Sequence, residues 1–264
     1  MKWPTELLLI RHAESLYNNL KKKKEADPDY QRFMKLYTKD RSNPENLSLA
    51  RLLQKRHSLG CSDRDTPLTT KGELQARITG RRMRVSGVSC PDVIFVSPYL
   101  RTLQTLHFLK EEWPELGTAK EYHEERIRER DHGLSLLYND WRIYHVLHPE
   151  QAELQLLLGE YDYRFLNGEN IPDVRQRTHS WIATLTREFA GKRVMAITHH
   201  LTILATRANF ERLGPEEFLH LDKNDKPVNC GVTRYVGITL DGRSKLKIEK
   251  YNEQYCRDEE SLAT

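Results

Sequence analysis

The sequence of 264 residues has few cysteines, a small net charge and no long apolar run. The four cysteines are widely spaced and form no C-x-x-C pair, so they indicate neither a zinc site nor a disulfide framework. We therefore expect reduced thiols, as in a cytoplasmic protein. The formal net charge of +4 is too small to indicate a nucleic-acid partner, although it does not repel an anionic substrate.

No stretch approaches the roughly 18–20 apolar residues that a membrane span needs. The N-terminus has Lys2 but no apolar segment and no small-residue cleavage site, so we expect neither a membrane segment nor a secretory signal. The length suits one domain with a substantial core, and we expect a single domain over residues 1–264.

Three apolar runs end in polar residues. They are "ELLLIRH" (6–12), "DVIFVSPYLR" (92–101) and "RVMAITHH" (193–200). Continuous Val, Ile, Leu and Phe runs of this length are typical of parallel strands buried on both faces. Helical patterns follow Thr70 and Asp173. Alternating strands and helices predict an α/β fold, a three-layer sandwich with a mostly parallel central sheet flanked by helices.

Ligands of such sheets bind outside the carboxyl ends of the strands, where helix N-termini also favour anions. Arg11, His12, Arg101 and His199 all lie at or just beyond these ends. One histidine after a strand is more often a structural residue, but two histidines and two arginines at one edge favour a phosphate pocket. Arginine suits this task because it can bind phosphate oxygens in bidentate fashion.

Five motifs carry a resemblance to a known family. They are "LLLIRHAES" (7–15), "DTPLTTKGELQA" (65–76), "SPYLRTLQT" (97–105), "IRERDHG" (127–133) and "AITHH" (196–200). In this order they resemble the histidine phosphatase superfamily, in its phosphoglycerate mutase-like branch. The resemblance implies a phosphoglycerate mutase-like fold and no cofactor or metal.

The resemblance also implies roles for individual residues. His12 would be the nucleophile that becomes phosphorylated, and Glu129 would be the proton donor to the leaving group. Arg11, Arg101 and His199 would complete the phosphate pocket. The predicted substrate-binding residues are Ser15, Asn18, Arg130 and His200.

The sequence departs from the family pattern at two positions, where Ala13 and His200 replace the usual glycines. Ala13 is small. His200 is bulky and titratable, and two orientations stay open, one with the ring beside the pocket and one with the ring turned away.

The segment between residues 133 and 169 bears on the reaction type. Mutases that act on phosphoglycerate hold the substrate carboxylate with a lysine and two adjacent arginines after the glutamate motif. Here the segment contains Arg142 and Arg164, without a lysine. We therefore expect metal-independent hydrolysis of a phosphate ester, on a small molecule rather than a protein. Mutase activity and a catalytically weak phosphate-binding module are the alternatives.

A metal site is a further, less favoured hypothesis, based on His145 and His148 at i, i+3 and on the adjacent His199 and His200. It lacks an acidic or cysteine partner at a familiar spacing. The sequence leaves the oligomeric state open, and a homo-oligomer is compatible with it.

Two segments are expected to add to the domain, a helical insertion at about 19–60 and a cap region at about 133–172. Within the insertion, Tyr30, Phe33, Met34 and Tyr37 follow helical spacing, and Asn43-Pro44 predicts a break before a second helix. The run "KKKK" at 21–24 is expected to be a solvated face. Asp241-Gly242 predicts a hairpin turn near the C-terminal end.

Overall fold

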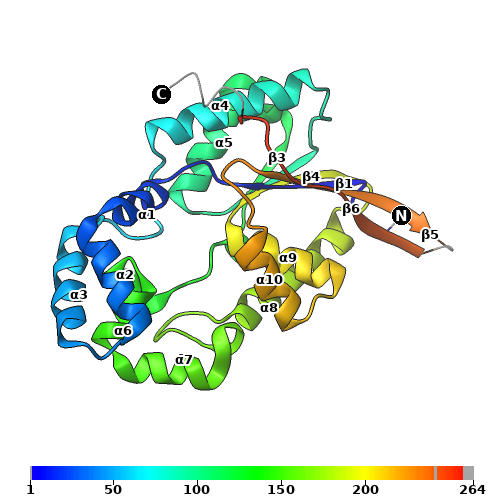
Figure 1. Ribbon diagram of the computed structural model, residues 1–264. Coiled ribbons are helices and arrows are strands. Elements are labelled where there is room, and N and C mark those ends of the chain that lie inside the picture. Colours follow the sequence, from blue (N-terminus) through cyan, green and yellow to red (C-terminus); the bar gives the residue numbers. More distant parts are fainter. Residues whose placement is uncertain (1, 241–242, 258–264) are drawn as a thin grey trace. The chain divides into compact units, whose positions relative to one another are not determined.

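The computed structural model describes residues 2–240 and 243–257, and its chain divides into two compact units (Figure 1). The sheet unit comprises Met1–Ser15, Arg64–Glu129 and Val174–Thr264. The helical unit comprises Leu16–Asp63 and Arg130–Asp173. The prediction of one domain with an insertion at about 19–60 and a cap at about 133–172 stays a prediction, although the helical unit contains both ranges.

A six-stranded mixed sheet forms the centre of the sheet unit, with the order β3-β2-β4-β1-β5-β6. The four strands β3, β2, β4 and β1 are parallel, and β5 and β6 extend the sheet as antiparallel strands. The strand bounds are β1 Glu6–Arg11, β2 Val93–Val96, β3 Lys120–His123, β4 Arg193–Thr198, β5 Val232–Leu240 and β6 Arg243–Glu253.

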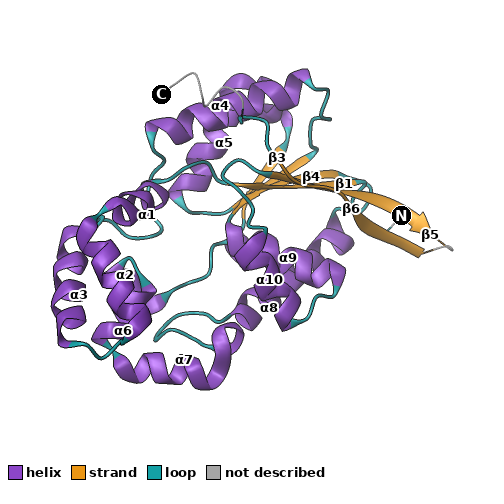
Figure 2. Ribbon diagram, viewed as in Figure 1, coloured by secondary structure: helices purple, strands orange, loops and turns teal. Residues whose placement is uncertain are grey.

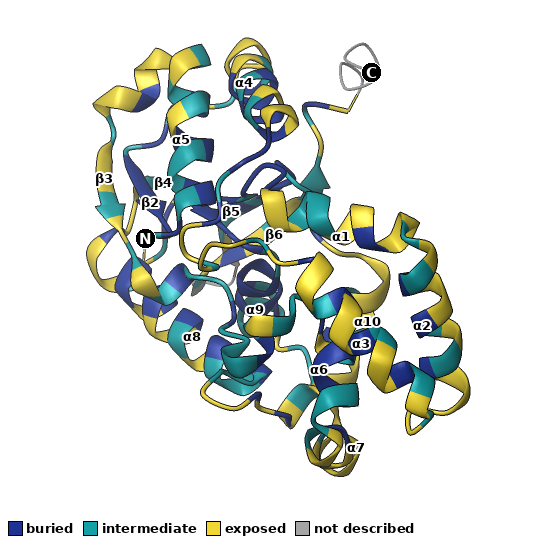
Figure 3. Ribbon diagram, turned by 90° about the vertical axis from the view of Figure 1, so that its left-hand side faces the viewer, coloured by how far each residue is buried: buried dark blue, intermediate teal, exposed yellow. Residues whose placement is uncertain are grey.

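Helices cover both faces of this sheet, as the sequence predicts (Figure 2). On one face Leu7, Leu9 and Phe95 pack with α8 and α9 residues such as Trp181 and Ile203. On the other face the strand residues Leu8, Ile10 and Ile94 pack with helix residues. These include Met83 of α4 and Leu106 of α5. The period-2 alternation of the strands thus distributes their side chains between two cores. The buried inner strands are visible in Figure 3.

Two helices of the sheet unit, α4 and α8, lie where the sequence predicts helical patterns, after Thr70 and Asp173. Thr69 caps α4, because its side-chain oxygen accepts a hydrogen bond from the backbone N–H of Gly72 at 3.0 Å. The bounds are α4 Thr70–Val85, α5 Leu100–Glu112, α8 Ile171–Glu188, α9 His200–Glu211 and α10 Pro215–Asn224, with the 3₁₀ turns η1 Pro114–Thr118 and η2 Glu125–Ile127. The first residues of α8 belong to the helical unit.

The helical unit contains the two helices predicted for the insertion. Asn43 caps the second of them and Pro44 occupies its first turn, as the break predicts. The bounds are α1 Leu16–Ala26, α2 Pro28–Lys39, α3 Pro44–Arg56, η3 Gly133–Tyr138, α6 Trp141–Leu147 and α7 Pro149–Asp162. None of the helices in residues 2–240 and 243–257 combines the length and apolar character that a bilayer-spanning segment requires.

One residue of the lysine run contradicts the expected solvated face. Lys24 is only 3% exposed, and its Nζ lies 3.0 Å from the Oδ2 of Asp140. The hydroxyl of Tyr30 donates a second hydrogen bond to the same oxygen at 2.6 Å. The charge pattern of the run could not reveal this, because the carboxylate that compensates Lys24 is more than a hundred residues away in the sequence.

The sequence predicted the C-terminal hairpin but not the edge strand β3. The predicted C-terminal hairpin is present as β5 and β6, while its turn residues Asp241 and Gly242 lie outside the described residues. Strand β3 was not predicted, because its four residues are mostly exposed at the sheet edge and lack an apolar run.

The buried Lys24–Asp140 pair leads to a stability prediction. Asp140→Asn removes the negative charge and leaves the Lys24 ammonium buried, which should lower the free energy of unfolding by about 3–5 kcal/mol. Glu45→Gln is the control, since Glu45 pairs with Arg32 at the exposed surface and its loss should cost less than about 1 kcal/mol. Urea unfolding followed by circular dichroism measures both. Equal stability of the two variants would contradict the prediction.

Candidate active site

The strand register aligns the ends of three neighbouring strands. Arg11, the last residue of β1, is opposite Thr198 at the end of β4. Val96, the last residue of β2, is opposite Ile197. These strands are followed by His12, Ser97 and His199, which therefore emerge at the same edge of the sheet, as predicted for His12 and His199.

His12 is held as a neutral imidazole with one defined tautomer. It is 4% exposed, and its Nδ1 lies 2.7 Å from the carbonyl oxygen of Ala13, which can only accept a hydrogen bond. Nδ1 is therefore the protonated nitrogen, and the lone pair is on Nε2. Burial lowers the pKa of His12 well below 6.5, and the charges of Arg101 and Arg11 lower it further. The arrangement leaves a nucleophilic nitrogen ready at neutral pH.

His199 is the second buried imidazole of the site. It is fully buried, and its ring centroid lies 5.2 Å from that of His12. Its Nε2 lies 2.7 Å from the Oγ of Ser97, whereas its buried Nδ1 has no hydrogen-bond partner among the described residues. Burial lowers the pKa of His199 well below 6.5, with a further contribution from Arg101. If Ser97 donates to Nε2, then Nδ1 carries the proton and can donate to an oxyanion.

The two predicted arginines lie in the same buried environment. The Nη1 of Arg11 donates to the carbonyl oxygen of Pro227 at 2.7 Å, which fixes the orientation of its guanidinium. Burial lowers the pKa of Arg11 to about 10, against the opposing effect of the Glu129 carboxylate, so the group keeps its charge at neutral pH. Arg101 is 4% exposed, with its guanidinium carbon 4.8 Å from the ring centroid of Tyr99.

Thr105 joins the helix of Arg101 to the loop of the nucleophile. Its hydroxyl donates to the carbonyl oxygen of Arg101 at 2.6 Å and accepts from the backbone N–H of Ala13 at 3.0 Å. A single side chain thus ties the first turn of α5 to the residue after His12. The sequence analysis assigned no role to Thr105, although it lies in the quoted motif 97–105.

The backbone that carries Glu129 is fastened by side chains from α8 and α9. The guanidinium of Arg177 donates to the carbonyl oxygens of Arg128 at 2.8 Å and Glu129 at 3.1 Å. The hydroxyl of Thr202 donates to the Arg128 carbonyl oxygen at 2.6 Å. The effect of Glu129 on the pKa of Arg11 places its carboxylate within electrostatic reach of the pocket. Arg177 was not recognised from the sequence, because an arginine inside a helical pattern has no distinguishing signal.

The predicted substrate-binding residues belong to both units. Ser15 and His200 are in the sheet unit, and Ser15 is buried and forms an isolated bridge with Leu68. Asn18 and Arg130 are in the helical unit. The guanidinium of Arg130 donates to the carbonyl oxygens of Tyr163 at 3.0 Å and Glu169 at 2.8 Å, which gives it a structural role there. Contact of these four residues with a substrate stays a prediction.

The histidines of the metal hypothesis have other surroundings. His145 is buried among aromatic rings, and burial lowers its pKa to about 4. The Nε2 of His148 lies 2.7 Å from the hydroxyl of Tyr138. In the described ranges, no group of three or more His, Cys, Asp or Glu side chains is arranged to hold a metal ion.

The carboxyl ends of the parallel strands bring together two neutral histidines and two arginines, an arrangement suited to binding a phosphoryl group. Comparison with protein families agrees. The model of the histidine phosphatase superfamily (branch 1) matches residues 53–247, and the chain belongs to this superfamily. Arg11 and His12 precede the matched range, so their assignment depends on the motif and the geometry described above.

Sequence relatives carry mutase names. The chain is 29% identical over 178 residues to a phosphoglycerate mutase-like protein of Arabidopsis thaliana, a match that covers 57% of this chain and 61% of that protein. It is 32% identical over 144 residues to a 2,3-bisphosphoglycerate-dependent phosphoglycerate mutase of Methylobacterium radiotolerans, covering 52% of this chain and 63% of that protein. The matches thus span less than two thirds of the length of these relatives.

Solved structures with the same fold carry phosphatase names. An alpha-ribazole phosphatase from Shigella flexneri has a TM-score of 0.64 at 16% identity, over 94% of this chain and 96% of that chain. A mycobacterial glucosyl-3-phosphoglycerate phosphatase with inorganic phosphate has a TM-score of 0.59 at 17% identity, over 95% of this chain and 98% of that chain. At this identity the likeness shows the fold alone.

The His12 geometry leads to a spectroscopic prediction. At pH 7 a long-range ¹H–¹⁵N correlation spectrum should show His12 as a neutral ring with the proton on Nδ1. Because its pKa is lowered, the signals should not shift down to pH 5, whereas an unfolded sample should titrate near about 6.5. The spectrum of His12→Ala assigns the signals. A proton on Nε2, or a midpoint near that of the unfolded sample, would refute the assigned tautomer.

Proposed function

We propose that this protein is a metal-independent phosphomonoesterase that hydrolyses a phosphate ester through a phosphohistidine on His12. The observation that carries the proposal is the state of His12, with Nδ1 bound to the Ala13 carbonyl and Nε2 left with its lone pair beside two arginines. A neutral imidazole can attack phosphorus, while an imidazolium cannot.

The first step transfers the phosphoryl group to the protein. The lone pair of Nε2 attacks phosphorus, the bond from phosphorus to the ester oxygen breaks, and Glu129 gives its proton to the leaving oxygen. Arg11, Arg101 and the Nδ1–H of His199 stabilise the charge on the phosphoryl oxygens. Phosphoryl transfer depends mainly on positioning and charge stabilisation, which these groups supply.

The second step returns the protein to its starting state. The Glu129 carboxylate takes a proton from a water molecule, whose oxygen attacks phosphorus. The bond from phosphorus to Nε2 breaks, and its electron pair returns to the imidazole. Inorganic phosphate is the product, and Glu129 is protonated again for the next cycle.

Hydrolysis is preferred to mutase activity because of the segment 133–169. Its two arginines have partners within the helical unit. Arg164 pairs with Asp173 at 2.7 Å, and the guanidinium carbon of Arg142 lies 4.5 Å from the ring centroid of Trp141. This supports a substrate that has no carboxylate for these arginines to bind. We propose a small phosphorylated molecule as the substrate, in keeping with the named phosphatases of the same fold.

The cytoplasmic location stays a proposal that depends on the thiols. The four cysteines are far apart in the sequence and form no C-x-x-C pair. Such thiols fit a reducing compartment.

The names of the sequence relatives favour mutase activity as the second candidate. The two reactions are separated by incubating the protein with 3-phosphoglycerate and 2,3-bisphosphoglycerate. Formation of 2-phosphoglycerate faster than release of inorganic phosphate would identify a mutase and overturn the proposed hydrolysis.

Loss of the nucleophile should abolish turnover. With p-nitrophenyl phosphate and excess chelator, His12→Ala should lower kcat by about 10³-fold or more. Acid quenching of the wild-type reaction with ³²P-labelled substrate should trap an acid-labile phosphate on the protein, absent from the variant. His107→Ala is the control, because His107 is an exposed residue of α5. Turnover above about a tenth of wild type in His12→Ala would reject His12 as the nucleophile.

The role of Glu129 should depend on the leaving group. Glu129→Gln should slow an alkyl phosphate by about 10²-fold or more, but p-nitrophenyl phosphate far less, because a good leaving group needs no protonation. Glu125→Gln is a matched control, because Glu125 lies in the same segment and is exposed. Equal slowing of both substrates by Glu129→Gln would remove Glu129 from the role of proton donor.

A further inference from the structure

The ring of His200, which replaces the usual glycine, makes contact with the neighbouring helix. Its Nε2 lies 2.7 Å from the Oδ1 of Asp222, near the end of α10, and the two side chains are 19% and 20% exposed. His200 is the first residue of α9, directly after His199. The contact therefore links the start of α9, at the phosphate pocket, to the last turn of α10.

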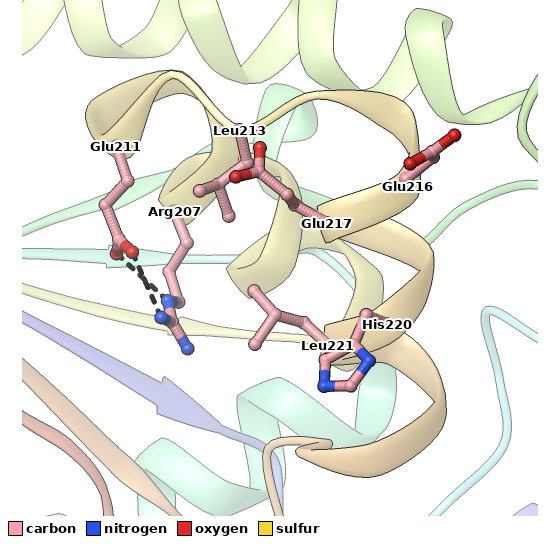
Figure 4. A pocket seen from close by; sticks show the side chains of 7 residues that line it. All are labelled: Arg207, Glu211, Leu213, Glu216, Glu217, His220 and Leu221. Atoms are coloured by element: carbon pink, nitrogen blue, oxygen red, sulfur yellow. Dashed lines mark hydrogen bonds and ion pairs between the residues drawn. The ribbon is translucent and has the colours of Figure 1, made fainter.

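Most residues of α10 are exposed. Phe218 is its buried residue, whereas α9 is buried along much of its length (Figure 3). Arg207 of α9, Leu221 of α10 and Leu213, which lies between the two helices, help to line a cavity of about 450 Å³ (Figure 4). The contact at His200 is therefore one of the places where the two helices meet.

The segment that follows α10, residues 225–231, holds the phosphate pocket directly. The Pro227 carbonyl oxygen accepts the hydrogen bond from the Arg11 guanidinium at 2.7 Å. The Nδ2 of Asn229 donates to the carbonyl oxygen of His12 at 2.9 Å. The backbone N–H of Cys230 donates to the carbonyl oxygen of Arg11 at 3.1 Å. Both the nucleophile and the first arginine thus depend on where this segment lies.

We propose that His200 and Asp222 form a positioning pair, which fixes the end of α10 and so the segment 225–231 that orients Arg11 and His12 toward an oxyanion. Asp222 is only five residues before Pro227. A displaced carbonyl at Pro227 would turn the Arg11 guanidinium, and bidentate binding of phosphate is sensitive to such a change. The expected effect of the pair on turnover rests on the proposed function. Its expected effect on phosphate binding does not.

Affinity for inorganic phosphate tests the pair directly. Isothermal titration calorimetry would compare wild type, His200→Gly, Asp222→Ala and the double variant. Each single variant should raise the Kd for phosphate about fivefold or more. Because the two residues act as a unit, the Kd of the double variant should be no higher than the higher Kd of the two single variants. His220→Ala is the control, since His220 is an exposed residue of the same helix, and its Kd should stay within about twofold of wild type.

Conservative variants separate positioning from simple stabilisation. His200→Gln keeps a side-chain N–H donor that can reach Asp222, so it should bind phosphate within about threefold of wild type. Asp222→Asn keeps the size but loses the charge, and should weaken binding by about threefold. These two variants also serve if the truncated ones do not fold. Thermal unfolding is recorded for all of them.

The outcomes are distinct from those of the proposed function. Single variants that bind phosphate like wild type, or losses that add in the double variant, would overturn the positioning pair. A lower Tm with unchanged Kd would also overturn it, because the contact would then only stabilise the fold. Wild type that binds phosphate without hydrolysing p-nitrophenyl phosphate would refute the proposed function alone. Wild type that does not bind phosphate would refute both.

Discussion

The hydrogen bond between His12 Nδ1 and the carbonyl oxygen of Ala13 is the contact on which the chemistry of the site depends. It decides which nitrogen carries the proton and aims the other one away from the backbone. Ala13 is itself held by Thr105, whose hydroxyl also binds the Arg101 carbonyl. The tautomer of the nucleophile and the position of an arginine are therefore set through one short chain of contacts.

The histidines at this edge of the sheet have different charged neighbours. His12 and His199 are buried near two guanidiniums, and both effects keep them neutral. His200 is partly exposed and faces the carboxylate of Asp222 instead. The adjacent residues His199 and His200 thus have different neighbours. The difference arises because the first is the residue before α9 and the second is its first residue, so their side chains leave the backbone in different directions.

Strands β1, β2 and β4 were predictable because they are buried on both faces and have continuous apolar sequences. β3 was not, because an edge strand with exposed side chains has no such signal. The break at Asn43-Pro44 was correctly predicted from local chemistry, since a cap and a proline need no distant partner. Lys24 was misjudged because its burial depends on Asp140, which folding brings close from another part of the chain.

The sequence by itself determined the strand ends, the residue types that follow them and the family motifs, because each of these is a property of a short segment. Only the tertiary structure decided which groups fasten those residues. Pro227, Asn229 and Arg177 contribute backbone carbonyls or side chains that are remote in sequence from the residues they hold. Such contacts depend on the register of the sheet and the docking of helices, which local patterns do not encode. The tertiary structure also decided the orientation of His200, because its partner Asp222 lies on another helix.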